Sequence, residues 1–176
     1  MDTRIANLLK ENDISVQSFD DAVYSTILAG IFETICKEIK KQNKKTEELI
    51  RFRNSRDHIL VTKGIVNRYM GCKLSEQEYL YLYQLLRAFF RKKDYRIEIP
   101  VKTRTDLLTL QNYRCPFCKR TIDIRNSHLD HIVPWDFVGD ELMDNYQMLC
   151  ARCNERKGAS SFFGLSMLFY NTSRML

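Results

Sequence analysis

The sequence is poor in turn-forming residues and contains no long apolar run. Its 176 residues include three prolines and six glycines, which disfavours a collagen-like chain, a disordered tether or a β-sandwich with many tight turns. No segment approaches the ~18 consecutive apolar residues of a membrane-spanning helix. The first residues also lack the apolar core of a secretory signal. We therefore expect a globular chain that does not bind a membrane and is located in the cytoplasm.

Cysteine is too scarce for a disulfide-stabilised scaffold, with six in the chain, but its distribution is uneven. Four of the six form two C-x-x-C pairs, Cys115 with Cys118 and Cys150 with Cys153. In a reducing compartment such pairs indicate a metal site more often than a disulfide. Two intervening residues let one turn direct both thiolates at one ion, and two such turns complete the tetrahedron of structural zinc. A redox pair and separately buried cysteines are the alternatives, although a redox pair needs no duplicate.

Positive charge is concentrated in the first part of the chain. Residues 1–96 hold 18 Lys and Arg against 13 Asp and Glu, whereas residues 97–176 hold 10 against 9. Solvated helix faces are the simpler explanation for this excess, and a face that contacts phosphate groups is the alternative. The basic residues form two main clusters: Arg51, Arg53 and Arg56 in one, and Arg87, Arg91, Lys92, Lys93 and Arg96 in the other.

Residues 1–95 show the apolar periodicity of α-helices. Apolar side chains recur every four positions from Phe19 to Ile35, which places them on one helix face. Capping and breaking signals then divide the region into elements. The predicted elements are a helix that begins after Ser18, a helix over 46–71, a helix over 75–92 with a capping box formed by Ser75 and Glu78, a short strand over 95–101 and a helix over 103–111.

The 31 residues between the two cysteine pairs contain groups suited to hydrolysis. Asp130 and His131 lie in an alternating run that ends at Pro134, which predicts a short strand. Phosphodiester hydrolysis needs a base near the attacking water, and imidazole titrates near neutral pH, so His131 is the candidate general base. His128 has three open interpretations: a surface side chain, a phosphate contact or an auxiliary metal ligand.

Taken together, these segments resemble the zinc-stabilised HNH endonuclease family over about residues 103–158. The resemblance implies a ββα-metal catalytic module that is stabilised by a four-cysteine zinc site. It implies that Asp130 and Asn154 hold a single catalytic Mg²⁺ or Mn²⁺, and that Asn145 orients the base His131. The matching motifs are Cys115-Pro116-Phe117-Cys118, Asp130-His131-Ile132-Val133-Pro134, Asp144-Asn145-Tyr146-Gln147, and Cys150-Ala151-Arg152-Cys153-Asn154 with Lys157-Gly158.

We therefore predict an α+β chain with two domains. Residues 1–95 are expected to form a mostly α-helical region, and residues 96–176 the ββα-metal HNH module followed by an apolar C-terminal tail. The predicted function is metal-dependent hydrolysis of phosphodiester bonds in double-stranded DNA, in restriction or phage defence, although the motif does not exclude RNA. The candidate substrate contacts are Lys157, Arg156 and His128.

Two other functions stay open at this point. The chain can be the nuclease subunit of a multi-protein defence complex, with the helical region binding a partner protein or a second copy of the chain. It can also be a catalytically silent, zinc-stabilised DNA-binding module, which would not need to keep Asp130, His131, Asn145 and Asn154 together. The apolar tail at residues 162–170 is expected to pack on the helical region or to form an oligomer interface.

Overall fold

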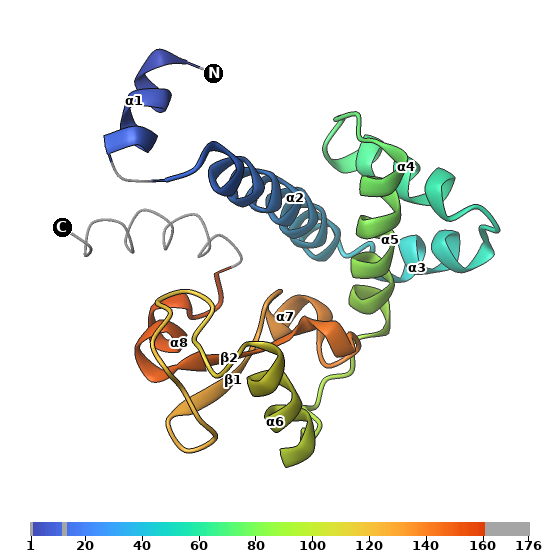
Figure 1. Ribbon diagram of the computed structural model, residues 1–176. Coiled ribbons are helices and arrows are strands. Elements are labelled where there is room, and N and C mark those ends of the chain that lie inside the picture. Colours follow the sequence, from blue (N-terminus) through green and yellow to red (C-terminus); the bar gives the residue numbers. More distant parts are fainter. Residues whose placement is uncertain (1, 12–13, 161–176) are drawn as a thin grey trace. The chain divides into compact units, whose positions relative to one another are not determined.

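The computed structural model describes residues 2–11 and 14–160 (Figure 1). It is mostly helical with one two-stranded antiparallel sheet, which confirms the predicted α+β class. Across these residues, none of the helices is both long and apolar enough to cross a membrane. The apolar tail at 162–170 lies outside the described residues. The elements are α1 (Thr3–Glu11), α2 (Val16–Lys41), α3 (Lys45–Asn54), α4 (His58–Tyr69), α5 (Glu76–Arg91), α6 (Val101–Leu110), β1 (Ser127–His131), α7 (Trp135–Val138), the 3-10 turn η1 (Met143–Asn145), β2 (Tyr146–Cys150) and α8 (Ala151–Lys157).

The chain divides into two compact units that alternate along the sequence. Among the described residues, the first unit contains 2–11, 14–27, 97–133 and 144–160. The second unit contains residues 28–96 and 134–143. We call the first the sheet unit, because it contains β1 and β2, and the second the helical unit. The sequence instead places one boundary near residue 95, and that division stays a prediction.

In the helical unit, α5 supplies much of the buried apolar surface. Leu82, Leu86 and Phe89 are fully buried and lie at helical spacing, so one face of α5 forms the core. The predicted capping box at the start of α5 is confirmed. The Ser75 hydroxyl accepts a hydrogen bond from the Glu78 backbone N–H at 3.3 Å, and the Glu78 carboxylate accepts one from the Ser75 N–H at 2.5 Å.

The prediction of a single helix over 46–71 is wrong, because the helix is interrupted between α3 and α4. Ser55 has extended backbone angles, and its hydroxyl donates a hydrogen bond to the Asp57 carbonyl at 2.9 Å. The Asp57 carboxylate in turn accepts a hydrogen bond from the Leu60 N–H at 2.9 Å and caps α4. Short polar side chains that bond nearby backbone groups compete with the helix in this way.

Two further local predictions need correction. The helix expected after Ser18 begins at Val16, since the Ser15 hydroxyl accepts a hydrogen bond from the Ser18 N–H at 3.1 Å and takes the capping position. The strand expected over 95–101 does not form within the described part of the chain. Pro100, which lacks an N–H and so cannot donate to a sheet, leads directly into α6.

The sheet unit is built on the β1–β2 pair, with α6 and α8 packed on β2. Side chains from these elements and from the segment between α6 and β1 form its apolar core: Leu108, Ile122, Met148 and Leu149, together with the cysteines. Gln111, just after α6, satisfies the β2 backbone at Met148. Its amide nitrogen donates to the Met148 carbonyl, and its amide oxygen accepts from the Met148 N–H, both at 2.8 Å.

Candidate active site

The sulfur atoms of the two C-x-x-C pairs converge on one point. All four lie within 4.8 Å of one another, and those of Cys118 and Cys150 are 3.6 Å apart. Zinc–sulfur bonds of ~2.3 Å in a tetrahedron give sulfur–sulfur edges of ~3.8 Å. Cys115, Cys150 and Cys153 are buried, and Cys118 is half-buried. The cluster can therefore hold a metal ion, and its donor set and spacing fit zinc.

Each cysteine pair is positioned by its own local structure. At the first pair, the Cys115 N–H donates to the Arg120 carbonyl and the Lys119 N–H donates to the Cys115 carbonyl, both at 2.9 Å. The second pair lies at the junction of β2 and α8, because Cys150 ends the strand and Cys153 lies in the first turn of the helix. A metal bound here would fix α8 against the sheet.

Burial is the main cause that raises the pKa of the Cys153 thiol, and the neighbouring Cys115 raises it further. The reason is electrostatic: a thiolate in a buried site is disfavoured, and more so beside other thiols. A bound cation reverses this preference and keeps coordinating thiols deprotonated. The four-cysteine cluster is thus a site where a metal ion and the thiolates stabilise each other.

Asp130 lies on β1 directly opposite Gln147 of β2, and its carboxylate is bonded on two sides. The Gln147 side-chain N–H donates to Oδ2 at 2.8 Å. The Lys157 ammonium lies 3.1 Å from Oδ2 and 3.2 Å from Oδ1. A carboxylate accepts in about four directions, so these two partners fix Asp130 and leave capacity for a further ligand.

Lys157, the last residue of α8, is buried, with 4% of its surface exposed. Besides the Asp130 carboxylate, its ammonium donates to the His131 carbonyl at 2.7 Å. This position differs from the substrate contact expected of Lys157. The ammonium bonds groups inside the domain because a largely buried carboxylate needs a compensating charge. Lys157 consequently ties the end of α8 to the end of β1.

Asn145 fastens the segment that follows β1. It is 5% exposed, its Oδ1 accepts a hydrogen bond from the Val133 N–H at 2.7 Å, and its Nδ2 donates to the Val133 carbonyl at 2.9 Å. Its own carbonyl accepts a hydrogen bond from the Ile132 N–H at 2.8 Å. The two residues after His131 are therefore fixed to the turn that precedes β2.

The remaining predicted site residues lie on β1 and α8. His131 is half-buried at the end of β1, with its ring centroid 4.9 Å from that of Tyr146 and the two planes at 59°. Asn154 is half-buried on α8, three residues before Lys157 and so on the same side of the helix. His128 and Arg156 are exposed.

Two polar contacts of Asp130 were not anticipated from the sequence. Gln147 lies within a motif that the resemblance identified, but its role depends on the register that places it opposite Asp130. Pairing a strand over Tyr146–Cys150 with the strand predicted at Asp130 would have revealed this neighbour. The sequence contains a weaker signal for the contact between Asp130 and Lys157, because this contact depends on how α8 packs against β1.

Comparison with known proteins finds similarity in the part of the chain that contains the candidate site. Residues 115–160 match the family model described as HNH endonuclease. Over 53 residues the chain is 40% identical to the CRISPR-associated endonuclease Cas9 of Corynebacterium diphtheriae, which covers 30% of this chain and 5% of that protein. The chain thus matches only a small part of that relative's length. No solved structure matches the chain. Residues 115–160 are an HNH endonuclease domain.

Proposed function

We propose that the chain is a metal-dependent endonuclease that hydrolyses phosphodiester bonds in DNA. One observation carries the proposal: within the HNH endonuclease domain, the largely buried Asp130 carboxylate is fixed by Gln147 and Lys157 next to His131. Consecutive residues of a strand point to opposite faces, so the proposal requires a bend at the end of β1 that brings the Asp130 carboxylate and the His131 imidazole toward one phosphate, as metal ligand and general base. The match to an endonuclease family supports the same reaction class.

Asp130 and Asn154 would hold the catalytic ion. A carboxylate and an amide are hard oxygen donors, which suit a single Mg²⁺ or Mn²⁺ that keeps most of its coordination positions for water and phosphate. When bound, such an ion stabilises the negative charge that develops on the phosphate and on the leaving oxygen. Gln147 and Lys157 orient the carboxylate before substrate arrives, so little reorganisation accompanies the reaction.

His131 would accept the proton of the attacking water. A general base must lie within hydrogen-bonding reach of that water, and small displacements slow the reaction strongly. Lys157 fixes the His131 carbonyl, and Asn145 fixes Val133 two residues later. Lys157 and Asn145 are thus positioning residues for His131: Lys157 holds its carbonyl group, and Asn145 holds the backbone that follows it.

The other roles follow from position. The four cysteines would hold a structural zinc ion that stabilises the domain. His128 and Arg156 are exposed and stay candidate phosphate contacts. The proposed biological setting is restriction or phage defence in the cytoplasm, with double-stranded DNA as the substrate. Binding of a partner protein or a second copy through the helical region stays a proposal as well.

Supercoiled plasmid provides the direct test. The purified chain is treated with a chelator, and Mg²⁺ or Mn²⁺ is then added together with plasmid. We expect nicked or linear DNA only after the divalent ion is restored. Binding without cleavage in every ion would contradict the proposal and favour the catalytically silent module. Cleavage only after a partner protein is added would favour the nuclease subunit of a larger complex.

A further inference from the structure

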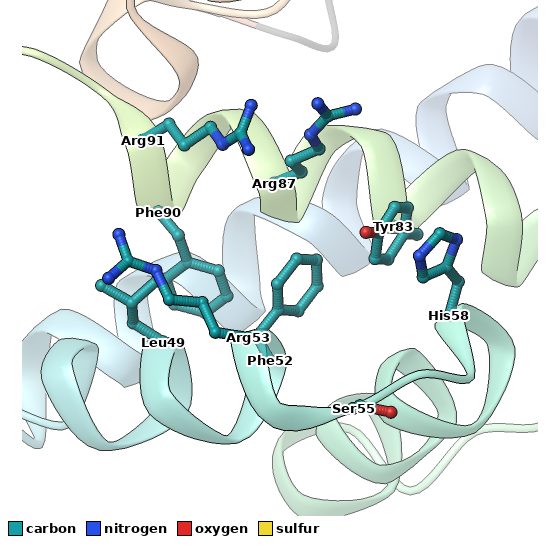
Figure 2. Close-up of a pocket in the computed structure, with 9 residues that line it drawn as sticks. All are labelled: Leu49, Phe52, Arg53, Ser55, His58, Tyr83, Arg87, Phe90 and Arg91. Carbon is teal, nitrogen blue, oxygen red and sulfur yellow. The ribbon is translucent and has the colours of Figure 1, made fainter.

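The helical unit contains a pocket of about 290 Å³ between α3, the start of α4 and α5 (Figure 2). Its position is separate in sequence from the HNH endonuclease domain, and the proposed hydrolysis does not use it. Three aromatic and three basic side chains characterise its lining: Phe52, Tyr83 and Phe90, and Arg53, Arg87 and Arg91.

Stacked rings form the apolar side of the pocket. The rings of Phe52 and Tyr83 are nearly parallel with centroids 4.7 Å apart, and His58 stacks on Tyr83 at 4.0 Å. Phe90 packs against Phe52 with centroids 5.2 Å apart. Phe52 is 8% exposed and Phe90 6%, so this side of the pocket is anchored in the core of the unit. Tyr83 is half-buried and His58 is exposed, so these two rings are the part of the aromatic surface that a ligand can reach.

Guanidinium groups from two helices border the same pocket. Arg53 lies in the last turn of α3, and Arg87 and Arg91 lie one turn apart on α5. All three are exposed, and Figure 2 shows their side chains around the cavity. Neither Asp nor Glu lines the pocket. The ion pairs of the described residues include none of these three arginines, so the pocket concentrates uncompensated positive charge.

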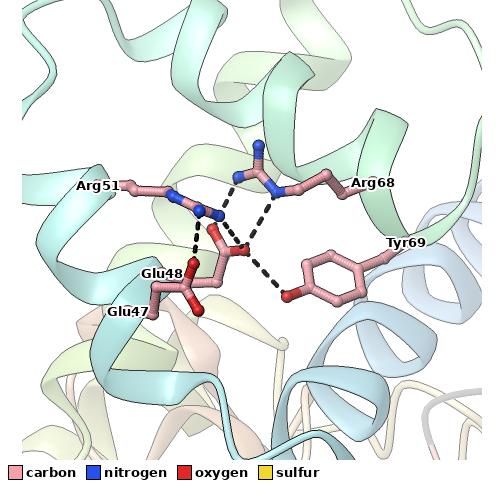
Figure 3. Close-up of polar contacts among 5 residues, drawn as sticks. All are labelled: Glu47, Glu48, Arg51, Arg68 and Tyr69. Carbon is pink, nitrogen blue, oxygen red and sulfur yellow. Dashed lines mark hydrogen bonds and ion pairs between the residues drawn. The ribbon is translucent and has the colours of Figure 1, made fainter.

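Other arginines of the unit are used differently. Glu48 is fully buried, and its carboxylate accepts hydrogen bonds from Arg51 at 3.1 Å, from Arg68 at 2.7 Å and from the Tyr69 hydroxyl at 3.0 Å (Figure 3). Arg51 also pairs with Glu47. Arg51, which the sequence groups with Arg53 and Arg56, is thus occupied by acidic residues of its own helix. The pocket arginines have no such structural use.

The simplest alternative is that these cations complement helix ends. Arg53 and Arg91 do lie in the last turns of α3 and α5, where positive charge stabilises a helix. Arg87 lies a turn earlier, so the same reason does not explain it. Helix ends also do not require that cations from two helices border one cavity with an aromatic surface. The arrangement fits a ligand that carries both a phosphate group and a planar ring.

We propose that this pocket binds one unpaired nucleotide of a nucleic-acid strand, with its phosphate on the arginines and its base against the aromatic surface. Arginine binds phosphate through paired N–H groups, and stacking of bases on aromatic side chains is how proteins bind unpaired strands. The volume lies near the lower end of the ~300–1,000 Å³ typical of ligand pockets, which suits a single nucleotide. The inference deepens the proposed nuclease function, on which it rests for the choice of a nucleic acid.

Binding of a labelled strand tests the proposal. The full chain carrying His131→Ala, which should not cleave, is titrated with a fluorescent DNA single strand of about 12 nucleotides, within the ~4–16 that small single-strand sites cover. Binding is read by fluorescence anisotropy at one fixed salt concentration. The pocket variant combines Arg53→Gln, Arg87→Gln and Arg91→Gln. The control combines Lys44→Gln, Lys63→Gln and Lys73→Gln, which removes the same charge from exposed positions of the helical unit.

We expect the pocket variant to raise the Kd for the single strand about tenfold or more, while the control changes it far less. We also expect deoxyadenosine monophosphate to displace the strand at a lower concentration than inorganic phosphate does. Equal weakening by the two triple variants would overturn the proposal, because charge alone would then explain binding. Equal weakening for a duplex of the same length would also overturn it, since a duplex exposes no unpaired nucleotide.

Two controls keep the result interpretable. Melting temperatures of both triple variants show whether they are folded. If the pocket triple variant is not folded, the single variant Arg87→Gln replaces it. Plasmid cleavage by the chain with His131 intact is measured separately. If the chain does not cleave plasmid but its strand binding depends on the pocket arginines, the nuclease function alone is refuted. If the chain cleaves plasmid but its strand binding does not depend on these arginines, the nucleotide-binding role of the pocket alone is refuted.

Discussion

The ammonium of Lys157 on α8 lies 3.1 Å from the carboxylate of Asp130 on β1, and both side chains are almost inaccessible to solvent. The same ammonium bonds the His131 carbonyl at 2.7 Å. A buried ion pair of this kind contributes little net stability relative to an apolar pair, but removing one partner leaves an uncompensated charge. The relationship therefore predicts unequal effects for lysines and arginines that are adjacent in sequence.

Lys157→Met should destabilise the sheet unit by ~3–5 kcal/mol, because Asp130 would be left largely buried and without its cation. Urea unfolding followed by circular dichroism measures the change in free energy. Arg156→Met is the matched control, since Arg156 is exposed at the preceding position. It should cost less than ~0.5 kcal/mol, as surface substitutions usually do. Equal losses for the two variants would show that the Lys157–Asp130 contact is not formed.

Asn145→Ala should destabilise the domain by roughly 2–3 kcal/mol, because it removes two hydrogen bonds and leaves the Val133 backbone groups unpaired. It should also slow DNA nicking, since the segment after His131 would no longer be fixed. Asn67→Ala, at an exposed position of α4, controls for the loss of an amide. A stable Asn145→Ala protein with unchanged nicking would contradict the positioning role.

Local sequence patterns predicted the four-cysteine cluster. The cysteine spacing alone indicated one metal centre, and the four sulfurs do converge. The capping box at Ser75 was equally readable, because both of its partners lie within one helical turn. Features that depend on packing between elements were not predicted. The Lys157–Asp130 contact needs α8 packed against β1, and the nucleotide pocket needs α3 packed beside α5.

The helix break at Ser55 has a different cause. Residues 53–58 are all polar, as exposed stretches of helices also are, and apolar residues resume at Ile59, so the sequence predicts one helix over 46–71. The break depends on which backbone groups the hydroxyl of Ser55 and the carboxylate of Asp57 bond. Side-chain competition for backbone groups is a small energetic effect, and composition alone does not reveal its outcome.

Cys150→Ser should remove zinc from the chain and lower its melting temperature strongly, because structural zinc binding is coupled to folding. Zinc is counted by native mass spectrometry, with one ion per chain expected in the parent. Cys72→Ser is the control, since Cys72 lies outside the four-cysteine cluster in the helical unit. Retention of one zinc ion by the Cys150→Ser variant, with an unchanged melting temperature, would contradict the assignment of the metal centre.

Tyr69 predicts a pH dependence in the helical unit. Burial, followed by the hydrogen bond to Glu48, raises the pKa of Tyr69 to about 12. Because the folded pKa lies above the unfolded value of about 10, stability is fully present below pH 10. It is then lost progressively as the pH rises toward 12.

The comparison of the parent with Tyr69→Phe isolates this effect. Free energies of unfolding are measured from neutral pH upward, and the parent should lose more stability above pH 10 than the variant, which has no phenol at this position. Tyr81→Phe, at an exposed position of α5, should follow the parent. Identical alkaline profiles for the parent and Tyr69→Phe would show that Tyr69 titrates as it does in the unfolded chain.

The rate of plasmid nicking by His131→Ala tests directly whether His131 is the general base. With Mg²⁺ or Mn²⁺ in excess, we expect the nicking rate to fall ~10²–10⁴-fold relative to the parent, which is the usual contribution of a general base. Asn67→Ala, at an exposed position of α4, should nick close to the parent rate. Nicking by His131→Ala at the parent rate would contradict the assignment of His131 as the base of this HNH endonuclease domain.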